Sequence, residues 1–87
     1  MNCKIVLTPQ AVEDLSCLDK PISQSIANKI DWLAQHIDSI IPVPLKGNFK
    51  GMYKLRIGDW RVIYSFEKAS QIITLYAAKH RSKVYKT

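Results

Sequence analysis

Hydrophobic residues change their spacing near the middle of the chain, from the period of a helix to that of a strand. Lys4 to Thr8 is a short apolar run typical of a buried strand, and Thr8-Pro9 then has the residue types that begin a helix. Beyond that point apolar residues recur at steps of three and four, with one break at 19–21: Ala11, Leu15, Leu18, Ile22, Ile26, Ile30, Leu33 and Ile37. The first half therefore predicts one strand and two helices.

The second half alternates between apolar and polar residues, which predicts strands. Three such segments cover Met52 to Ile57, Trp60 to Phe66 and Gln71 to Ala78. Gly58-Asp59 predicts a tight hairpin turn, and 67–70 a slightly longer one. We therefore expect a single α+β domain over residues 1–87, in the order β-α-α-β-β-β. Its antiparallel sheet should carry the N-terminal helical hairpin on one face.

The tight turn also predicts the register of the hairpin, with Arg56 opposite Arg61. One face of the hairpin is then apolar and should pack under the helices: Tyr53, Leu55, Ile57, Trp60, Val62 and Tyr64. The other face carries Lys54, Arg56 and Arg61. If the next turn spans 67–70, Tyr76 lies beside Arg61 on that same face.

Charge is distributed unevenly along the chain. Residues 1–45 hold three lysines against five acidic residues, a net charge of −2, whereas residues 46–87 hold ten basic residues against two acidic ones, a net charge of +8. Such a basic half favours a polyanionic partner, either nucleic acid or an acidic protein. Like charges directly opposite each other destabilise a sheet by about 0.2–1 kcal/mol, so Arg56 against Arg61 suggests a bound anion. The alternative is a basic face that is merely solvated.

Several classes of protein are not indicated. The apolar runs are far shorter than the roughly 20 residues that span a bilayer, and the first residues do not resemble a secretion signal, so we expect a cytoplasmic protein. Cys3 and Cys17 fit small packing residues better than a disulfide framework. They form no metal-ligand pattern with His36 and His80, and we expect neither a metal nor a cofactor.

Two stretches resemble the signature of RelE-type toxins, which belong to the RelE/ParE superfamily. They are Gly51 to Tyr64 (GMYKLRIGDWRVIY) and Lys79 to Tyr85 (KHRSKVY). The resemblance implies the toxin of a type II toxin-antitoxin system, an endoribonuclease that cleaves messenger RNA in the ribosomal A site. It also implies a cognate antitoxin, which would hold the toxin inactive in a hetero-oligomer. Two alternatives remain: a poison of DNA gyrase, as in the ParE branch, and a non-catalytic basic module that binds nucleic acid.

The resemblance also assigns site residues by motif. Catalytic roles fall on Lys54, Arg56, Arg61, His80, Arg81 and Tyr85, and contacts to RNA on Lys46, Lys50, Lys79 and Lys83. Cleavage needs no nucleophile from the protein, because the 2′-hydroxyl of RNA can attack the adjacent phosphate. Guanidinium groups suit the balancing of charge on that phosphate. Lys54 is the candidate general base, with a simpler role as another contact to the phosphate left open, and the general acid is left open between His80 and Arg81.

Overall fold

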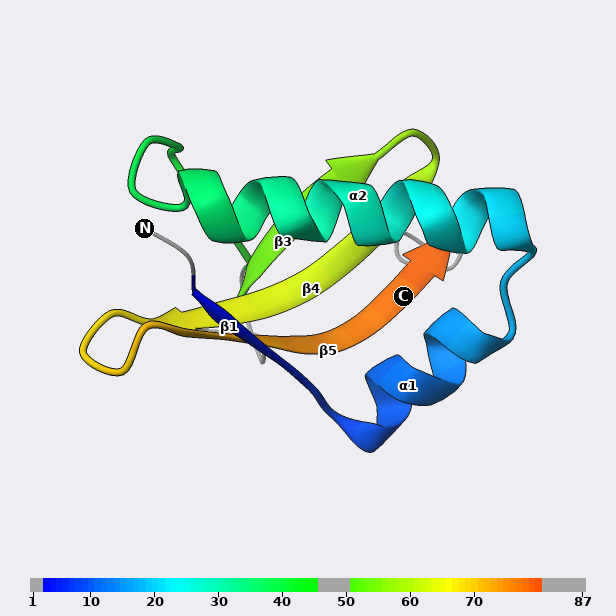
Figure 1. Cartoon of the computed structure of the whole chain (residues 1–87), viewed down its shortest axis with the longest axis horizontal. Coiled ribbons are helices and arrows are strands. Elements are labelled where there is room, and N and C mark those ends of the chain that lie inside the picture. The colour runs from blue at the N-terminus through cyan, green and yellow to red at the C-terminus, as the bar shows by residue number, and fades with distance from the viewer. Residues whose placement is uncertain (1–2, 46–50, 81–87) are drawn as a thin grey trace.

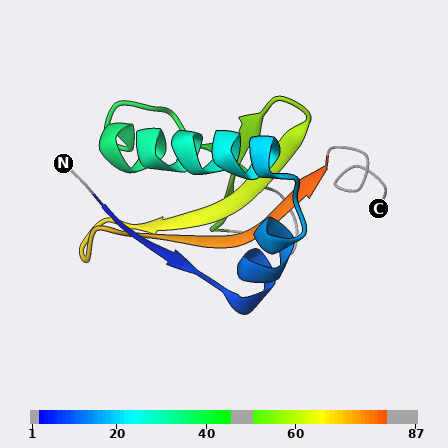
Figure 2. The same ribbon diagram turned by 45° about the vertical axis from the view of Figure 1, so that its right-hand side comes forward.

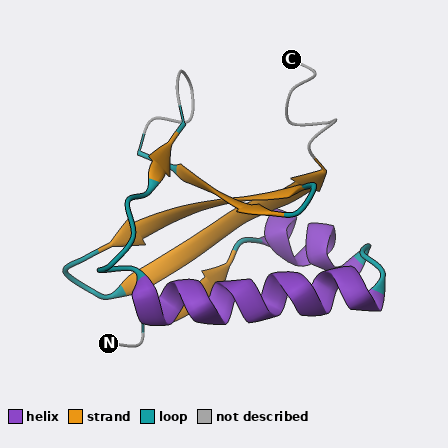
Figure 3. Ribbon diagram, turned by 90° about the horizontal axis from the view of Figure 1, so that it is seen from above, coloured by secondary structure: helices purple, strands orange, loops and turns teal. Residues whose placement is uncertain are grey.

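Two helices cover one face of a five-stranded sheet, and no helix covers the other face within residues 3–45 and 51–80, which the computed structural model describes (Figure 3). The elements follow in the order β1 (Lys4–Leu7), α1 (Pro9–Ser16), α2 (Lys20–His36), β2 (Val43–Pro44), β3 (Tyr53–Ile57), β4 (Trp60–Glu67) and β5 (Ile72–His80). The strands lie side by side as β1-β5-β4-β3-β2. Figure 1 shows the first four of them in this order. The predicted α+β class is confirmed.

The start of α1 agrees with the sequence prediction. Thr8 is the N-cap, and its Oγ1 accepts a hydrogen bond from the backbone N–H of Ala11 at 3.2 Å. Pro9 occupies the first turn, where its missing N–H is not needed by the helix. The same Thr8 hydroxyl donates to the carbonyl oxygen of Tyr76 in β5 at 3.1 Å, so the cap also ties the helix to the sheet.

The hydrophobic core lies between α2 and the middle of the sheet. Its most deeply buried side chains, each less than 2% exposed, are Ile26, Leu33, Val62, Tyr64, Ile73 and Leu75. Trp60 packs against this cluster and is partly buried, as are Tyr53, Leu55 and Ile57. The predicted apolar face of the β3–β4 hairpin is therefore confirmed. Burial raises the pKa of the Tyr64 hydroxyl, and the neighbouring Tyr53 adds to the shift.

The first strand differs from the prediction in its pairing and its exposure. β1 runs parallel to β5, with Lys4 opposite Ile72 and Leu7 opposite Leu75, so the sheet is mixed rather than antiparallel. β1 is also an edge strand, which leaves Val6 38% and Leu7 41% exposed, and the prediction of a buried strand was wrong. At the opposite edge, β2 adds a short strand that the pattern did not predict.

The β4–β5 hairpin has a different register from the one predicted. Arg61 stands opposite Lys79, and the prediction of Tyr76 beside Arg61 was wrong. Two local features cause the difference. Gln71 adopts a positive φ of 58° in a turn that spans residues 68–71, one residue later than predicted, and the register then shifts at Ile63/Tyr64 through a β-bulge.

Helix α1 lies at the end of β1 and beside the second half of β5 (Figure 2). Thr8 makes the last backbone contact of the β1 segment, its N–H donating to Leu75 O at 3.0 Å. From there on, side chains of α1 and its cap supply partners to β5. Neither helix in the described part of the chain is long and apolar enough to cross a membrane.

Candidate nucleic-acid interface

Three basic residues form a row across three strands on the sheet face that the helices leave uncovered. Arg56 of β3 is the direct partner of Arg61 of β4, and Arg61 is the direct partner of Lys79 of β5. Direct partners on adjacent strands point to the same face, so the three side chains are neighbours. We call Arg56, Arg61 and Lys79 the basic row. Lys54 lies two residues before Arg56 in β3 and so shares its face.

Arg56 and Arg61 differ in their exposure. Arg56 is exposed, whereas Arg61 is only 5% exposed. Nη1 of Arg61 donates to the carbonyl oxygens of Gly58 at 3.2 Å and Trp60 at 3.1 Å, and Nε of Arg56 reaches the same Gly58 oxygen at 3.4 Å. The carbonyl dipole offsets part of the repulsion between the two guanidinium groups. The shared acceptor accounts for the pair without a bound anion, and the anion suggested by the sequence stays a prediction.

Gly58 places that carbonyl through its backbone conformation. Its φ of +59° stands at the first central position of the two-residue turn, where a type II′ hairpin takes glycine. A side chain there would meet no neighbouring atom, so the backbone angle, and not space, favours glycine.

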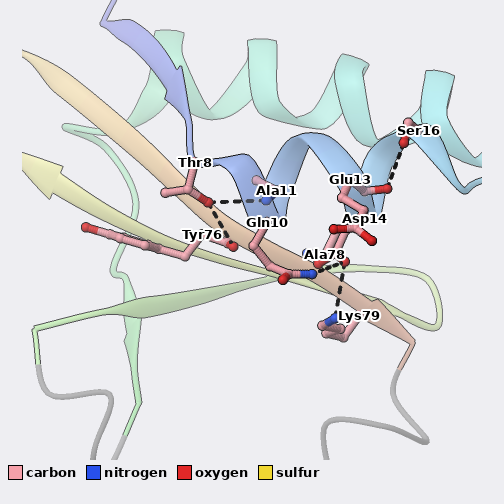
Figure 4. A network of polar contacts seen from close by, with 9 residues as sticks. All are labelled: Thr8, Gln10, Ala11, Glu13, Asp14, Ser16, Tyr76, Ala78 and Lys79. Carbon is pink, nitrogen blue, oxygen red and sulfur yellow. Dashed lines mark hydrogen bonds and ion pairs between the residues drawn. The ribbon is translucent and has the colours of Figure 1, made fainter.

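Lys79 is held by Asp14 of α1, a residue that sequence reasoning did not select (Figure 4). The Asp14 Oδ1 atom accepts from Lys79 Nζ at 3.2 Å and from Gln10 Nε2 at 2.8 Å, and Oδ2 accepts from the backbone N–H of Ala78 at 3.0 Å. Burial acts to raise the pKa of Asp14, but these hydrogen bonds and the charge of Lys79 together lower it. Asp14 thus replaces β1 as the partner of β5 and fixes the end of the basic row.

His80 is not brought together with Lys54 and Arg56. It is the direct partner of Trp60, and the two rings meet edge to face with their centroids 5.4 Å apart. Both side chains lie on the helix side of the sheet, where they line a cavity of about 560 Å³ with residues at the start of α2, among them Pro21 and Ile22. The sequence placed His80 in one constellation with the basic face, and the fold separates them by the thickness of the sheet.

The other expected site residues lie outside the described residues: Lys46, Lys50, Arg81, Lys83 and Tyr85. Within residues 3–45 and 51–80, no group of three or more histidine, cysteine or acidic side chains could hold a metal ion. Cys3 is buried and Cys17 exposed, and both are free thiols.

Comparisons with known proteins identify the family. Residues 5–85 match the sequence model of the ParE toxin of the type II toxin-antitoxin system, parDE. No curated protein sequence matches the chain significantly.

Solved structures share the fold over nearly the whole chain. The toxin-antitoxin complex RelBE2 from Mycobacterium tuberculosis has a chain that superposes with a TM-score of 0.83 at 19% identity, covering 94% of both chains. The archaeal RelE-RelB complex from Pyrococcus horikoshii OT3 gives 0.75 at 25% identity, covering 95% of this chain and 99% of that one. The YoeB/ParE toxin from Agrobacterium tumefaciens gives 0.74 at 22% identity, covering 88% and 96%. With a family match over 5–85 and these structural relatives, the chain belongs to the ParE toxin family, within the RelE/ParE superfamily of type II toxin-antitoxin toxins.

Proposed function

We propose that this toxin is an endoribonuclease that cleaves messenger RNA in the ribosomal A site, in the cytoplasm, and that a cognate antitoxin inhibits it. The observation that carries the proposal is the basic row together with Lys54 on the uncovered sheet face. Four cations on neighbouring positions of three strands form a surface for a phosphate backbone. Nearby, the hydroxyl groups of Ser65 and Tyr76 already form a hydrogen bond with each other at 3.0 Å.

The chemistry requires the protein to position RNA and to move two protons. The 2′-oxygen bonds to the adjacent phosphorus while the bond to the 5′-oxygen breaks, which gives a 2′,3′-cyclic phosphate and a free 5′-hydroxyl. Arg56 is exposed and carries a fork of donors, so it is our candidate for the group that contacts the phosphate. Lys54 is the candidate general base that takes the 2′-proton. Arg61 is buried, and we assign it the role of positioning Arg56 through the turn.

The proton for the leaving 5′-oxygen needs a second group. The contact of His80 with Trp60 on the helix side makes a positioning role at the end of β5 better supported than a general-acid role. Arg81, with Tyr85 to orient the phosphate or stack on a base, remains the candidate from the sequence. Lys46, Lys50, Lys79 and Lys83 would extend the contact to the RNA backbone, Lys79 after release from Asp14.

A poison of DNA gyrase is the second candidate. The family description names ParE, and this observation favours that activity directly. The RelE and YoeB names among the structural relatives favour the ribonuclease, but the fold is common to both groups. A basic module that binds nucleic acid without cleaving it is the third reading.

Primer extension on a messenger RNA in a reconstituted translation system separates these candidates, when it is run beside a gyrase supercoiling assay. The proposal expects breaks within codons that depend on the ribosome, and no effect on gyrase. Arg56→Ala should remove cleavage, whereas Lys68→Ala, which removes an exposed charge in the β4–β5 turn, should leave it unchanged. Intact message with gyrase-dependent DNA breaks would replace the proposal with the ParE activity. Full cleavage by Arg56→Ala would exclude the assigned role of the basic row.

A further inference from the structure

A cavity lies between the start of α2, the β3–β4 turn and the end of β5. Figures 1 and 2 show these three segments together at one end of the molecule. The cavity has a volume of about 560 Å³, and we call it the turn cavity. Its walls include apolar side chains and two rings: Pro21, Ile22, Ile26, Ile57, Trp60 and His80. It is therefore on the helix side of the sheet, whereas the basic row is on the other side.

The hairpin turn joins the turn cavity to the basic row. In β3, Arg56 of the basic row is followed by Ile57 of the cavity wall. In β4, Trp60 of the wall is followed by Arg61 of the row, because successive side chains of a strand point to opposite faces. Gly58 also lines the cavity, and its carbonyl oxygen accepts from Arg56 Nε at 3.4 Å and from Arg61 Nη1 at 3.2 Å. Since the sheet ends at this turn, a strand of RNA on the basic row has a short way round it into the cavity.

The walls of the turn cavity suit a flat, uncharged ring. The rings of Trp60 and His80 meet edge to face with their centroids 5.4 Å apart, and both also line a second cavity of about 270 Å³. Sites for small molecules have volumes of about 300–1,000 Å³ and mostly apolar walls, as this cavity has. Aromatic side chains in such a site stack on nucleobases, and this stacking accepts every base because every base has a π face.

The charges at the turn cavity favour a base over a phosphate as the group that enters. Among the described residues no lysine or arginine lines it, and the carboxylate of Asp59 stands at its exposed mouth. A phosphate inside would lose its water without gaining a cation, whereas a base is neutral and loses less. Water reaches the Asp59 carboxylate, so we give it no part in holding the base. The phosphate then stays on the basic row, where the cations are.

We infer that the turn cavity binds a nucleobase of the RNA, stacked on Trp60, beside the phosphate that Arg56 contacts. The inference deepens the proposed function and rests on it for RNA as the ligand. A base held beyond the turn limits the movement of the adjoining phosphate on the basic row. The cavity therefore adds affinity and alignment without selecting one base, since its walls are apolar and aromatic.

The test fills the turn cavity from its exposed wall and leaves the core in place. Ser25 of α2 is exposed and lines the cavity, so Ser25→Phe puts a ring into its entrance. Gln35→Phe is the matched control, because it puts the same ring at an exposed position of α2 about three turns further along. Both variants are made in the Trp32→Phe protein, in which Trp60 is the one remaining tryptophan. Thermal unfolding shows that each variant folds.

The probe is a trinucleotide with 2′-fluoro riboses, which has no 2′-hydroxyl to attack its phosphates, and a second trinucleotide lacks the middle base. Anisotropy of a 3′ fluorescent label gives the affinity of each, and quenching of Trp60 is recorded in the same titration. In the Trp32→Phe protein and in the Gln35→Phe control, we expect the complete trinucleotide to quench Trp60 and to bind about tenfold more tightly than the abasic one. In Ser25→Phe both should bind with the affinity of the abasic trinucleotide, and cleavage of messenger RNA should fall about tenfold.

Other outcomes would overturn the inference. Equal affinity for the complete and the abasic trinucleotide in the Trp32→Phe protein would show that no base is bound. A full difference in Ser25→Phe would show that the base lies outside the turn cavity. If the wild-type chain cleaves messenger RNA and Ser25→Phe cleaves it at the same rate, the proposed function stands and the base site fails. If Ser25→Phe removes the base-dependent binding but the wild-type chain cleaves no RNA, the base site stands and only the ribonuclease function fails.

Discussion

Arg56 and Arg61 stand directly opposite each other in β3 and β4 and donate to the same acceptor, the carbonyl oxygen of Gly58. Arg61 makes this contact from a buried position, whereas Arg56 makes it from the surface. A pair that the sequence presents as two equivalent phosphate ligands therefore consists of one residue that holds the turn and one that faces solvent. Substitutions should separate the two roles.

Arg61→Ala should lower the free energy of unfolding by about 2 kcal/mol, because it removes a buried side chain whose charged donor holds the carbonyl oxygens of Gly58 and Trp60. Arg56→Ala should lower it by less than about 0.5 kcal/mol, since exposed substitutions away from special features have small effects. Denaturation in urea at neutral pH measures both values. Equal stability of the two variants would show that the burial of Arg61 does not contribute to holding the turn. Arg61→Lys should not restore stability, because lysine lacks the planar fork.

Gly58→Ala tests the turn without touching a charge. The φ of +59° disfavours any residue with a Cβ, at a cost of about 1 kcal/mol, although there is room for the methyl group. A shifted carbonyl would release Arg56 and Arg61 from their shared acceptor. We therefore expect the rate of RNA cleavage to fall by more than the small loss of stability alone would cause. Asp59→Ala, at the next position of the turn, serves as the control. Full activity of Gly58→Ala would show that the shared carbonyl does not position Arg56.

The sequence predicted the β3–β4 hairpin correctly because its register depends on one local signal. Gly58-Asp59 forms a two-residue turn, and the alternation of side chains on both strands agrees with it. All five partner pairs from Tyr53–Tyr64 to Ile57–Trp60 follow from that turn. The apolar face and the opposition of Arg56 and Arg61 were predictable for the same reason.

The β4–β5 register could not be predicted in this way. A left-handed backbone at Gln71 and a bulge at Ile63/Tyr64 each move the pairing, and neither residue type signals the change. Lys79 therefore replaces Tyr76 beside Arg61. The contact of Asp14 with β5 could not be predicted either. It joins residues 64 positions apart and depends on how α1 packs at the end of β1.

His80→Phe separates a proton-transfer role from a packing role. Phenylalanine keeps an aromatic ring against Trp60 but cannot donate a proton, and loss of a general acid typically costs about 10²–10⁴ in rate. Because His80 contacts Trp60 on the helix side, we expect His80→Phe to retain cleavage within about tenfold of wild type. His80→Ala, which also removes the ring contact, should lose more activity and some stability. A fall of a hundredfold or more in the cleavage rate of His80→Phe would instead support His80 as the general acid.

Asp14→Asn tests how the stability that the Asp14 carboxylate gives to the fold depends on pH. The folded-state pKa of Asp14 lies below the ordinary value of 3.8, so the ionised carboxylate stabilises the fold fully above pH 3.8, and this contribution is lost as pH falls through the lower folded value. At about pH 7 we expect Asp14→Asn to be less stable by about 1 kcal/mol, since its side chain keeps an acceptor for Ala78 but loses the charge.

The ion pair itself contributes little to this difference, because the Lys79 side chain is 38% exposed and solvent weakens the attraction. Asp14→Ala should cost about 2 kcal/mol, since it leaves the Ala78 N–H without its acceptor. Urea denaturation from about pH 7 down to about pH 3 tests the prediction. The gap between wild type and Asp14→Asn should narrow as the carboxyl becomes protonated, and Asp38→Asn, at an exposed position after α2, controls for the loss of one negative charge. A gap that stays constant down to the lowest pH would show that shape, and not charge, makes Asp14 the partner of β5.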